Sequence, residues 1–190
     1  MAHLSIIGTG NMGQAIAGVV AKGGNTVELI GENDQTQPSG DIVVLAVPYP
    51  ALPAVIAERG ASLAGKIVVD ITNPLNFETF DSLVVPADSS AAAEIAARLP
   101  QSRVLKAFNT TFAGTLVAGT VGPNTTTVLI AGDDADAKTT LAGIIAAGGL
   151  KAVDAGSLKR ARELEALGFL QLTLAASEKV SWTGGFGVAA

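Results

Sequence analysis

The sequence predicts an α/β protein with a doubly wound, mostly parallel sheet. Two observations lead to this prediction. Short apolar runs alternate with helical patterns along the 190 residues, which is typical of a parallel sheet covered by helices on both faces. Hydrophobic residues make up 48% of the chain and charged residues 15%, which suffices for one domain with a packed core.

The first 47 residues contain three predicted strands and one unusual connection. Residues 4–7, 26–30 and 41–47 are short apolar runs, and residues 11–22 carry apolar side chains at helical spacing. The ten residues 31–40 are polar and rich in turn formers. A parallel crossover usually takes a dozen or more residues. The sequence therefore predicts a shortened segment after the second strand that lacks the usual helix; a missing strand is an open alternative.

The alternation continues to the end of the chain, and we find no repeat or linker within residues 1–190, which we expect to form a single domain. The remaining predicted elements are a helix over 50–59, a strand over 66–72, a helix over 89–99, strands over 103–109 and 125–132, a helix over 133–148 and a strand over 151–156. Ser157 then begins a long C-terminal helix that extends to about residue 182.

The composition excludes several classes of function. A net charge of −5 argues against a nucleic-acid-binding surface. The absence of cysteine and the single histidine argue against disulfides, thiol catalysis and a metal centre. The most apolar run, residues 42–57, is shorter than the roughly 18 residues of a membrane span, and no signal peptide is recognisable. We expect a cytoplasmic protein that does not bind membranes.

The stretch IIGTGNMGQAIA, residues 6–17, predicts a dinucleotide-binding turn of the Rossmann type. Gly8 permits a tight turn after a strand, Gly10 lets the backbone approach a pyrophosphate, and Gly13 lets helix and strand pack closely. The N–H groups at the start of the helix would then face the phosphates. The alternative is that the glycines only shape the turn.

The choice between NAD and NADP depends on the residues that follow the second strand. Glu32 follows Gly13 by 19 residues, and the chain contains no Lys or Arg between Lys22 and Arg59. A carboxylate here accepts hydrogen bonds from the ribose hydroxyls of NAD and repels the extra phosphate of NADP. The local chemistry therefore favours NAD, unless Glu32 simply points into solvent.

Six segments in order resemble one family: IIGTGNMGQAIA (6–17), VLAVPYPAL (44–52), VVDITNPLN (68–76), VLKAFNTTFA (104–113), LIAGDD (129–134) and DAGSLKRARELEAL (154–167). The chain resembles the NADP oxidoreductases that depend on a deazaflavin coenzyme, in particular the small bacterial dinucleotide-binding members, and the related reductase domain of the STEAP metalloreductases. The resemblance covers nearly the whole chain and implies a Rossmann-type fold and NADP as cofactor.

The resemblance also implies a cofactor site. Its members are Thr9, Asn11 and Met12 around the pyrophosphate, Val47, Pro48 and Tyr49 beside the ribose and nicotinamide, Asn73 and Pro74 at a strand end, and Ala107, Phe108, Asn109 and Thr110 near the nicotinamide, where a second substrate docks.

The chain departs from this family at two places. NADP-binding members carry a Ser-Arg-Arg-like stretch where this chain has Glu32, Asn33 and Asp34, which argues against recognition of a 2′-phosphate. The deazaflavin reductases have a histidine at the position of Asn109, which argues against transfer of the deazaflavin substrate to this chain.

We expect hydride transfer between the dinucleotide and a small planar acceptor, best a flavin or deazaflavin, because such chemistry needs little help from side chains. No catalytic residue is assigned, since the polar candidates near the site include no obvious proton donor. An imine or carbonyl reductase is an alternative, because GNMGQAI also resembles pyrroline-carboxylate reductases. Carbonyl reductases of the short-chain type pair Tyr with Lys four residues on, however, and Tyr49 is followed by Pro53. A non-catalytic NAD(P)-binding redox sensor is the third hypothesis.

Two further expectations concern structure. Lys106 and Asp70 are interpreted as structural, Lys106 in an ion pair and Asp70 bonded to backbone N–H groups, with a substrate role as the alternative for each. Arg162 is expected to pair with Glu165. The run LGFLQLTLAA, residues 167–176, is apolar on nearly all sides. A homodimer through the C-terminal helix would cover it, and would place Trp182 and Phe186 near a cleft of the same chain or of the partner.

Overall fold

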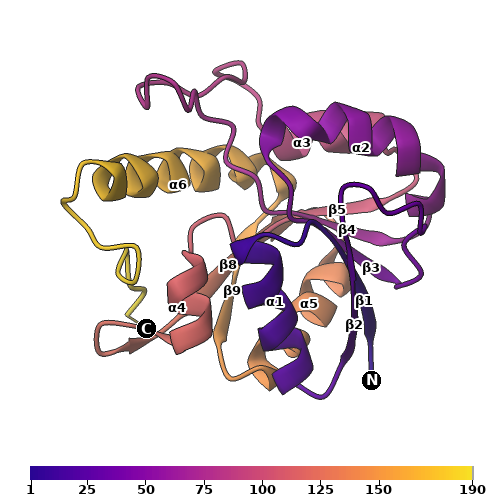
Figure 1. Ribbon diagram of the computed structural model, residues 1–190, viewed down its shortest axis with the longest axis horizontal. Helices are drawn as coiled ribbons and strands as arrows, with labels where there is room; N and C mark the ends of the chain where they lie inside the picture. Colours follow the sequence, from indigo (N-terminus) through magenta and orange to yellow (C-terminus); the bar gives the residue numbers. More distant parts are fainter. Residues whose placement is uncertain (190) are drawn as a thin grey trace.

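The computed structural model describes residues 1–189 and confirms the predicted α/β fold with a mostly parallel sheet (Figure 1). Seven strands lie in the order β2-β1-β3-β4-β5-β8-β9. The first five are parallel, β8 runs antiparallel to β5, and β9 is parallel to β8. The strands are β1 (His3–Ile7), β2 (Thr26–Ile30), β3 (Ile42–Leu45), β4 (Ile67–Asp70), β5 (Arg103–Lys106), β8 (Thr127–Gly132) and β9 (Lys151–Gly156).

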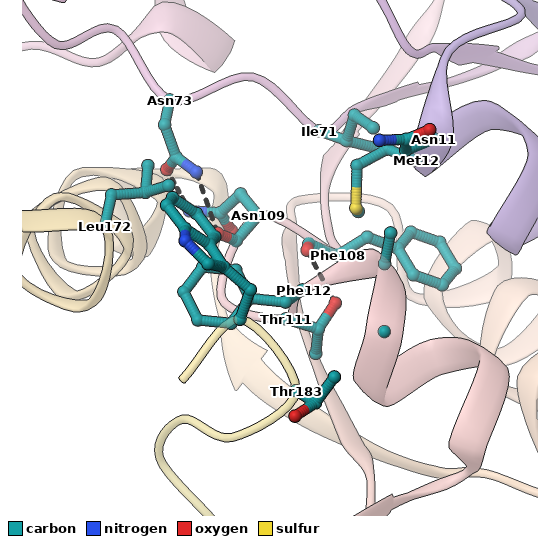
Figure 2. Close-up of a pocket in the computed structure, with 13 residues that line it drawn as sticks. Asn11, Met12, Ile71, Asn73, Phe108, Asn109, Thr111, Phe112, Leu172 and Thr183 are labelled. Carbon is teal, nitrogen blue, oxygen red and sulfur yellow. Dashed lines mark hydrogen bonds between the residues drawn. The ribbon is translucent and has the colours of Figure 1, made fainter. Parts of the chain in front are cut away.

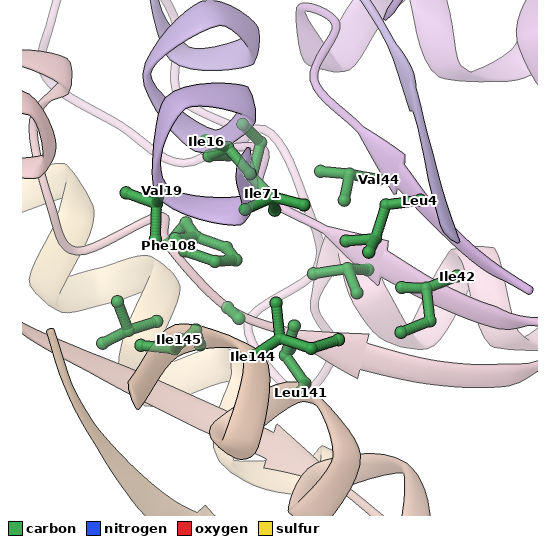
Figure 3. Packing of buried hydrophobic residues seen from close by; sticks show 14 of the residues in the cluster. Leu4, Ile16, Val19, Ile42, Val44, Ile71, Phe108, Leu141, Ile144 and Ile145 are labelled. Carbon is green, nitrogen blue, oxygen red and sulfur yellow. The ribbon is translucent and has the colours of Figure 1, made fainter. Parts of the chain in front are cut away.

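Helices cover both faces of the sheet, as a doubly wound fold requires. One face carries α1 (Asn11–Lys22), α4 (Ala113–Ala118) and α5 (Ala135–Ala147), and the other carries α2 (Leu52–Arg59), α3 (Ala91–Arg98) and α6 (Ala161–Ala176) (Figure 1). Short 3-10 turns precede or follow them: η1 (Tyr49–Ala51), η2 (Gly60–Leu63) and η3 (Leu158–Arg160). Each face has its own apolar core. Figure 3 shows the first, where Phe108 packs beside Val19 and Ile145.

The shortened connection between β2 and β3 is confirmed, and it explains the sheet order. β2 is the edge strand, and β3 pairs with the other side of β1, so residues 31–40 cross β1 without a helix. Polar contacts replace the apolar cover of that helix. Gly40 donates its N–H to Ser5 Oγ at 2.8 Å, and Glu28 accepts from the Ser39 N–H at 2.7 Å. A Cβ at Gly40 would lie 2.7 Å from the Ser5 nitrogen, so only glycine fits this crossing.

Residues 110–124 received no element prediction, and the structure places three elements there. The helix α4 is followed by a hairpin of β6 (Thr120–Val121) and β7 (Asn124–Thr125). Gly119 ends α4 in the left-handed region with φ +74°, as is usual for glycine after a helix. A six-residue helix and two-residue strands are too short to produce a periodic pattern.

Two predicted ends are wrong by more than two residues. The strand predicted over 103–109 ends at Lys106, and Phe108 adopts a left-handed conformation with φ +63°. The C-terminal helix ends at Ala176 and not at residue 182. Glu178 is left-handed with φ +57°, and the Lys179 N–H bonds to the Leu174 carbonyl at 2.8 Å. This is the bonding pattern of a Schellman ending, and the absence of glycine at its left-handed position hid it from the sequence.

The predicted homodimer requires apolar side chains of α6 to be exposed in the single chain. Leu170 is 49% exposed, while Gly168 and Gln171 on the same helix are buried. The homodimer stays a prediction. In the part of the chain that the structure describes, no helix is long and apolar enough to cross a membrane.

We predict that Glu178→Gly stabilises the fold. A non-glycine residue in the left-handed region costs about 1–2 kcal/mol, and the larger backbone freedom of unfolded glycine offsets part of the gain. The expected net increase in the free energy of unfolding is therefore about 0.5–1 kcal/mol. Urea denaturation followed by circular dichroism measures it.

Glu178→Ala is the matched control, because alanine removes the same side chain but keeps the strained conformation. It should leave the free energy of unfolding unchanged or lower it. An equal gain for both variants would show that the side chain, and not the backbone, carries the strain.

Candidate functional site

The turn between β1 and α1 has the close backbone packing that a dinucleotide-binding turn requires. Gly8 has φ +117°, and a Cβ there would lie 2.1 Å from the Ala46 carbonyl oxygen. A Cβ at Gly13 would lie 2.2 Å from the Gly8 carbonyl oxygen. Both glycines are therefore needed for packing. Val47, beside Gly8, forms the neighbouring wall after β3.

Gly10 differs from Gly8 and Gly13, because packing within the chain does not require a glycine at this position. A Cβ at Gly10 would meet no described atom within 4 Å. Gly10 is also the N-cap of α1 and has no side chain that could accept a hydrogen bond. The first N–H groups of the helix therefore have no capping side chain as acceptor. Open space in front of free N–H groups is what an approaching phosphate needs. The residues present therefore fit a pyrophosphate.

A cavity of about 450 Å³ begins at this turn (Figure 2). Its walls come from α1, from the segments after β4 and β5, from α4, from α6 and from the C-terminal tail. The lining residues are Asn11, Met12, Ile71, Asn73, Phe108, Asn109, Thr111, Phe112, Ala113, Gly114, Leu172, Trp182 and Thr183. None of these side chains is titratable. The cavity is therefore mainly apolar, with amide and hydroxyl groups as its polar members.

Asn73 and Asn109 form a bonded pair in the cavity wall (Figure 2). Asn73 Nδ2 donates to the Asn109 carbonyl at 2.9 Å, and Asn109 Nδ2 donates to Asn73 Oδ1 at 3.0 Å and to the Leu164 carbonyl at 2.8 Å. The pair therefore ties the residues after β4 and β5 to α6. Among residues 1–189, Asn109 Oδ1 has no hydrogen-bond partner.

The C-terminal tail closes one side of the cavity. Trp182 packs against Phe112 with ring centroids 5.0 Å apart and an interplanar angle of 56°. Gly114 on α4 lets the tail approach, since a Cβ there would lie 3.0 Å from Thr183 Cγ2. Trp182 lines this cavity of its own chain, as predicted, whereas Phe186, which was predicted to lie near a cleft with it, is not among the lining residues.

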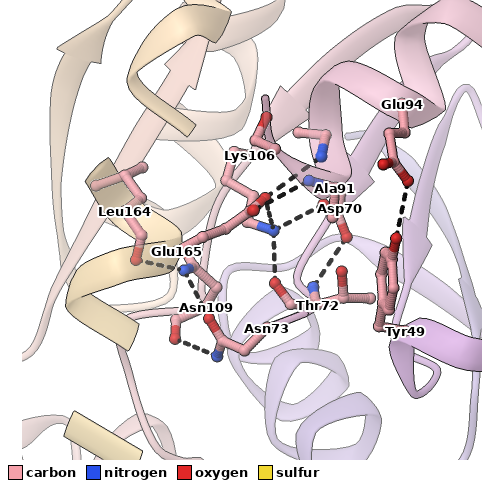
Figure 4. Close-up of polar contacts among 12 residues, drawn as sticks. Tyr49, Asp70, Thr72, Asn73, Ala91, Glu94, Lys106, Asn109, Leu164 and Glu165 are labelled. Carbon is pink, nitrogen blue, oxygen red and sulfur yellow. Dashed lines mark hydrogen bonds and ion pairs between the residues drawn. The ribbon is translucent and has the colours of Figure 1, made fainter. Parts of the chain in front are cut away.

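A buried ion cluster lies beside the pair of Asn73 and Asn109 (Figure 4). Lys106 Nζ is 2.7 Å from Asp70 Oδ2 and 2.8 Å from Glu165 Oε1, and all three side chains are fully buried. It also donates to the Thr72 carbonyl at 2.5 Å. The ion pair predicted for Lys106 is confirmed, and Asp70 accepts from the Thr72 N–H as expected.

Glu165 does not pair with Arg162, contrary to the sequence-based expectation. The helix α6 turns Glu165 inward, where it accepts from the Ala91 N–H at 3.0 Å and the Ala92 N–H at 3.3 Å. These are the first N–H groups of α3, which carry the positive end of the helix dipole. Burial raises the pKa of Glu165, and Lys106 and the Ala91 N–H oppose that shift.

Tyr49 lies beside the cluster but points toward α3. Its hydroxyl donates to Glu94 Oε2 at 2.8 Å (Figure 4). Burial raises the pKa of Tyr49 to about 12, and the hydrogen bond to Glu94 and its charge add to the shift. Tyr49 is not among the residues that line the cavity, so its hydroxyl is not placed there as a proton donor.

Glu32 and Asn33 are exposed at the carboxyl end of β2. The loop that carries them is fixed from below by Arg59, which is 2% exposed and donates to the carbonyl oxygens of Asp34 and Thr36. The guanidinium also faces Glu58 at 3.2 Å. The Arg59 guanidinium is therefore engaged by backbone carbonyl groups and by a carboxylate.

Of the residues that the resemblance implied, the structure brings Asn11, Met12, Asn73, Phe108 and Asn109 together around the cavity. The others lie nearby without lining it: Thr9 and Pro48 are exposed, Val47 is half-buried, and Pro74, Ala107 and Thr110 are buried. Their roles toward a cofactor stay predictions.

Sequence reasoning missed six members of the wall, which come from the segment after β4, from α4 and the residue before it, from α6 and from the C-terminal tail: Ile71, Phe112, Ala113, Gly114, Leu172 and Thr183. Thr111 was named as a polar candidate and does line the cavity. Phe112 and Gly114 stand in a segment for which no element was predicted. Their role as wall residues depends on the C-terminal tail, because Trp182 packs on Phe112 and Thr183 lies against Gly114. Across residues 1–189 there is no group of three or more His, Asp or Glu placed to hold a metal ion.

Comparison with known proteins gives consistent results. Residues 27–74 match the family model described as NADP oxidoreductase, coenzyme F420-dependent. The chain is 30% identical to the F420-dependent NADP reductase of Methanocaldococcus jannaschii, over 87% of this chain and 76% of that protein. It is 41% identical to rat metalloreductase STEAP3 over 55% of this chain and 20% of that protein. A crystal structure from Arthrobacter sp. FB24 matches over 100% of both chains, with a TM-score of 0.85 at 24% identity, which concerns the fold.

We predict that Lys106→Met lowers the free energy of unfolding by about 3–5 kcal/mol, because it leaves two buried carboxylates without their cation. Thermal and urea denaturation measure the loss. The triple variant Lys106→Met, Asp70→Asn, Glu165→Gln should recover a large part of it, because no uncompensated charge stays buried.

Lys151→Met is the control for a general effect of losing a lysine, because Lys151 is exposed on the edge strand β9. It should change stability by less than about 0.5 kcal/mol. Equal effects of Lys106→Met and Lys151→Met would contradict the importance of the buried cluster.

We predict that Tyr49, the only tyrosine, ionises with a midpoint of about 12, as followed by the ultraviolet absorbance of tyrosinate. Its pKa is higher in the folded than in the unfolded chain. Its stabilising contribution is therefore complete below pH ~10 and is lost as the pH rises through about 12. Glu94→Gln should lower the midpoint. A wild-type midpoint near ~10 would contradict the buried hydrogen bond.

Proposed function

We propose a function that proceeds from one premise: the chain belongs to the family of coenzyme F420-dependent NADP oxidoreductases. We infer that it transfers a hydride between a nicotinamide dinucleotide and a planar acceptor of the flavin or deazaflavin type. The chain's own residues would bind and orient the two reactants and exclude water between them.

One observation carries this proposal. Asn11 and Met12 belong to the first turn of α1, in front of which Gly10 leaves open space, and they also line the cavity. A molecule whose phosphates rest on that turn therefore has its next groups at the mouth of an apolar cavity. A dinucleotide has this sequence of groups, with pyrophosphate, ribose and an uncharged or weakly polar ring in order.

The cavity suits hydride transfer without acid–base help. When bound, the reduced dinucleotide would supply a hydride to the acceptor, and the proton that completes the reduction would come from bulk water once the hydride has moved. The side chains of Met12, Ile71 and Phe112 would exclude water from the two rings, and the amides of Asn73 and Asn109 would orient them. Holding the reacting atoms about 3–3.5 Å apart is then the main task of the protein.

The same cavity argues against imine or carbonyl reduction. Those reactions place a proton on the atom beside the reduced carbon, usually from a positioned acid. In the described part of the chain the cavity has no titratable side chain, and the Tyr49 hydroxyl is bonded to Glu94 on α3. A non-catalytic redox sensor is the function that binding without turnover would favour.

The loop after β2 favours NAD(H) for the adenosine end. Glu32 is exposed where a ribose would lie, and the Arg59 guanidinium is bonded to carbonyl oxygens and faces Glu58. A 2′-phosphate would meet the Glu32 carboxylate there, while the Arg59 guanidinium is already engaged by carbonyl groups. Although the family is named for NADP, we expect NADH to bind at least as tightly as NADPH.

We predict that calorimetric titration with NADH and with NADPH detects binding, and that Gly10→Ala weakens it by at least about tenfold, or ~1.4 kcal/mol. The added methyl would occupy the space that the pyrophosphate needs, while the fold should be unaffected because that space is empty of protein atoms. Thermal unfolding of the variant checks the fold.

Gly18→Ala is the matched control. Gly18 lies on the exposed face of the same helix, and a Cβ there also meets nothing within 4 Å. It should leave affinity unchanged and stabilise the helix by about 0.5–1 kcal/mol. No binding of either dinucleotide to the wild type would refute the proposal. A preference for NADPH of tenfold or more would refute only the assignment of NAD(H).

A further inference from the structure

We propose that residues 181–189 form a strap that opens and closes over the cavity, and that Gln171 is the latch that holds the strap closed. The strap runs from the end of α6 back past α4 (Figure 1). Its opening would admit a ligand, and its closing would retain that ligand. The opening of the ligand-free protein is independent of the proposed function, while closure on a dinucleotide rests on that function.

The strap is attached to the rest of the chain by few hydrogen bonds. Among residues 1–189, one hydrogen bond joins it to the body of the protein: the Phe186 N–H donates to Gln171 Oε1 at 2.9 Å. Its other hydrogen bonds close within the strap, such as the one from the Gly184 N–H to the Ser181 carbonyl at 2.9 Å. Release of a single bond therefore frees the backbone of the strap.

The apolar contacts of the strap are also limited. Trp182 packs on Phe112 and yet stays 53% exposed, and Phe186 stays 40% exposed. Because a half-exposed ring gains only part of the free energy of burial, these contacts stabilise the closed position weakly. Segments with few buried contacts open locally far more often than the whole domain unfolds.

The helix that carries the latch is fixed, in contrast to the strap. Glu165 lies in the buried ion cluster, and Gly168 packs so closely that a Cβ there would lie 2.3 Å from Asn73 Oδ1. The helix ends at Ala176, and Glu178 then turns the chain in the left-handed conformation. A fixed helix that ends in a tight turn before a weakly attached segment has the arrangement of a hinge.

Gln171 is placed to position the strap. It is buried, and its Nε2 donates to the Thr110 carbonyl at 3.2 Å, which orients the amide so that Oε1 faces the Phe186 N–H. Gly185 makes this approach possible, because it has φ +128° and a Cβ there would lie 2.7 Å from Gln171 Oε1. Gln171 itself does not line the cavity, so it acts on the cavity through the strap, as a positioning residue.

Closure brings two strap residues into the cavity wall. Trp182 and Thr183 line the cavity, and Gly114 on α4 lets them approach, since a Cβ there would lie 3.0 Å from Thr183 Cγ2. Opening removes both residues from the wall and widens the entrance. A ligand that contacts them therefore binds the closed form more tightly and shifts the population toward it.

The first experiment measures amide hydrogen exchange of the ligand-free protein by NMR. The Phe186 amide reports opening, because its N–H bonds to the latch. We expect it to exchange at least about tenfold more slowly than in an unstructured peptide, and at least about a hundredfold faster than the amide of Val44 in the central strand β3. Exchange as slow as that of Val44 would overturn the strap, because the tail would then open only with the whole domain. Exchange without protection would overturn the latch.

Gln171→Met keeps the length of the side chain and removes the donor and the acceptor. It should bring the exchange of the Phe186 amide to within about twofold of the unstructured peptide, since the latch is lost. Gln101→Met is the matched control, because Gln101 is exposed at the surface, and it should leave the Phe186 amide protected. Thermal unfolding checks that both variants are folded.

Gly185→Ala tests the latch from the strap, where a substitution does not disturb the core. The added methyl would meet Gln171 Oε1, and alanine is unfavourable at φ +128°, so protection of the Phe186 amide should be lost. Gly184→Ala is the matched control, because its Cβ would first meet Ser181 Oγ at 3.1 Å, within the strap. Full protection of the Phe186 amide in Gly185→Ala would overturn the latch, whether or not Gln171→Met folds.

The second experiment adds NADH or NADPH, whichever binds more tightly, at ten times its Kd. A ligand that binds only the closed form should slow the exchange of the Phe186 amide about elevenfold. Phe186 does not line the cavity, so slower exchange reports closure and not cover by the ligand. Gln171→Met should raise the Kd about three- to tenfold, because a smaller fraction of the protein is closed.

The outcomes separate this inference from the proposed function. Dinucleotide binding that leaves both the exchange of the Phe186 amide and the Kd of Gln171→Met unchanged would overturn the closure of the strap on a ligand and leave the function standing. Absence of dinucleotide binding would refute the function, while the exchange of the ligand-free protein and of its two latch variants would still decide whether the strap opens.

Discussion

The contact on which the site most depends is the one between Lys106 and the two buried carboxylates of Asp70 and Glu165. It joins the ends of β4 and β5 to α6, and through Glu165 it reaches the first turn of α3. One cation against two carboxylates would be unfavourable in a buried place. The N–H groups of Ala91 and Ala92 and of Thr72 supply the remaining stabilisation. The cluster is therefore viable only as a complete set, which ties four elements into one arrangement.

The buried cluster affects function through the residues at the ends of β4 and β5. Ile71 and Asn73 follow Asp70 by one and three residues, and Phe108 and Asn109 follow Lys106 by two and three residues; all four line the cavity. Because Lys106 bonds to the Thr72 carbonyl, the cluster sets the course of the chain where β4 ends. The pair of Asn73 and Asn109 makes a second link between the same elements, because Asn109 bonds to Asn73 after β4 and to the Leu164 carbonyl on α6. Charged residues thus position the site without entering it, which leaves the cavity itself free of titratable groups.

A second constraint comes from the short connection between β2 and β3. With no helix to cover β1, the loop lies on Ser5 through Gly40 and is fixed by Glu28 and Arg59. The same arrangement engages the Arg59 guanidinium with backbone carbonyl groups, and the proposed preference for NAD(H) therefore rests on Glu32 and its neighbours.

The sequence by itself determined the alternation of strands and helices, the glycine turn, the shortened connection and the family. These features are local: they depend on apolar spacing, on glycine at contact positions and on segments of about ten residues. Tertiary structure decided the partner of Glu165, the end of the last helix at Ala176 and the cavity wall built by Phe112, Leu172 and Trp182. Those contacts join residues far apart in the chain, and no local pattern encodes them. They form only because burial makes each unpaired charge or polar group costly until a distant partner completes it.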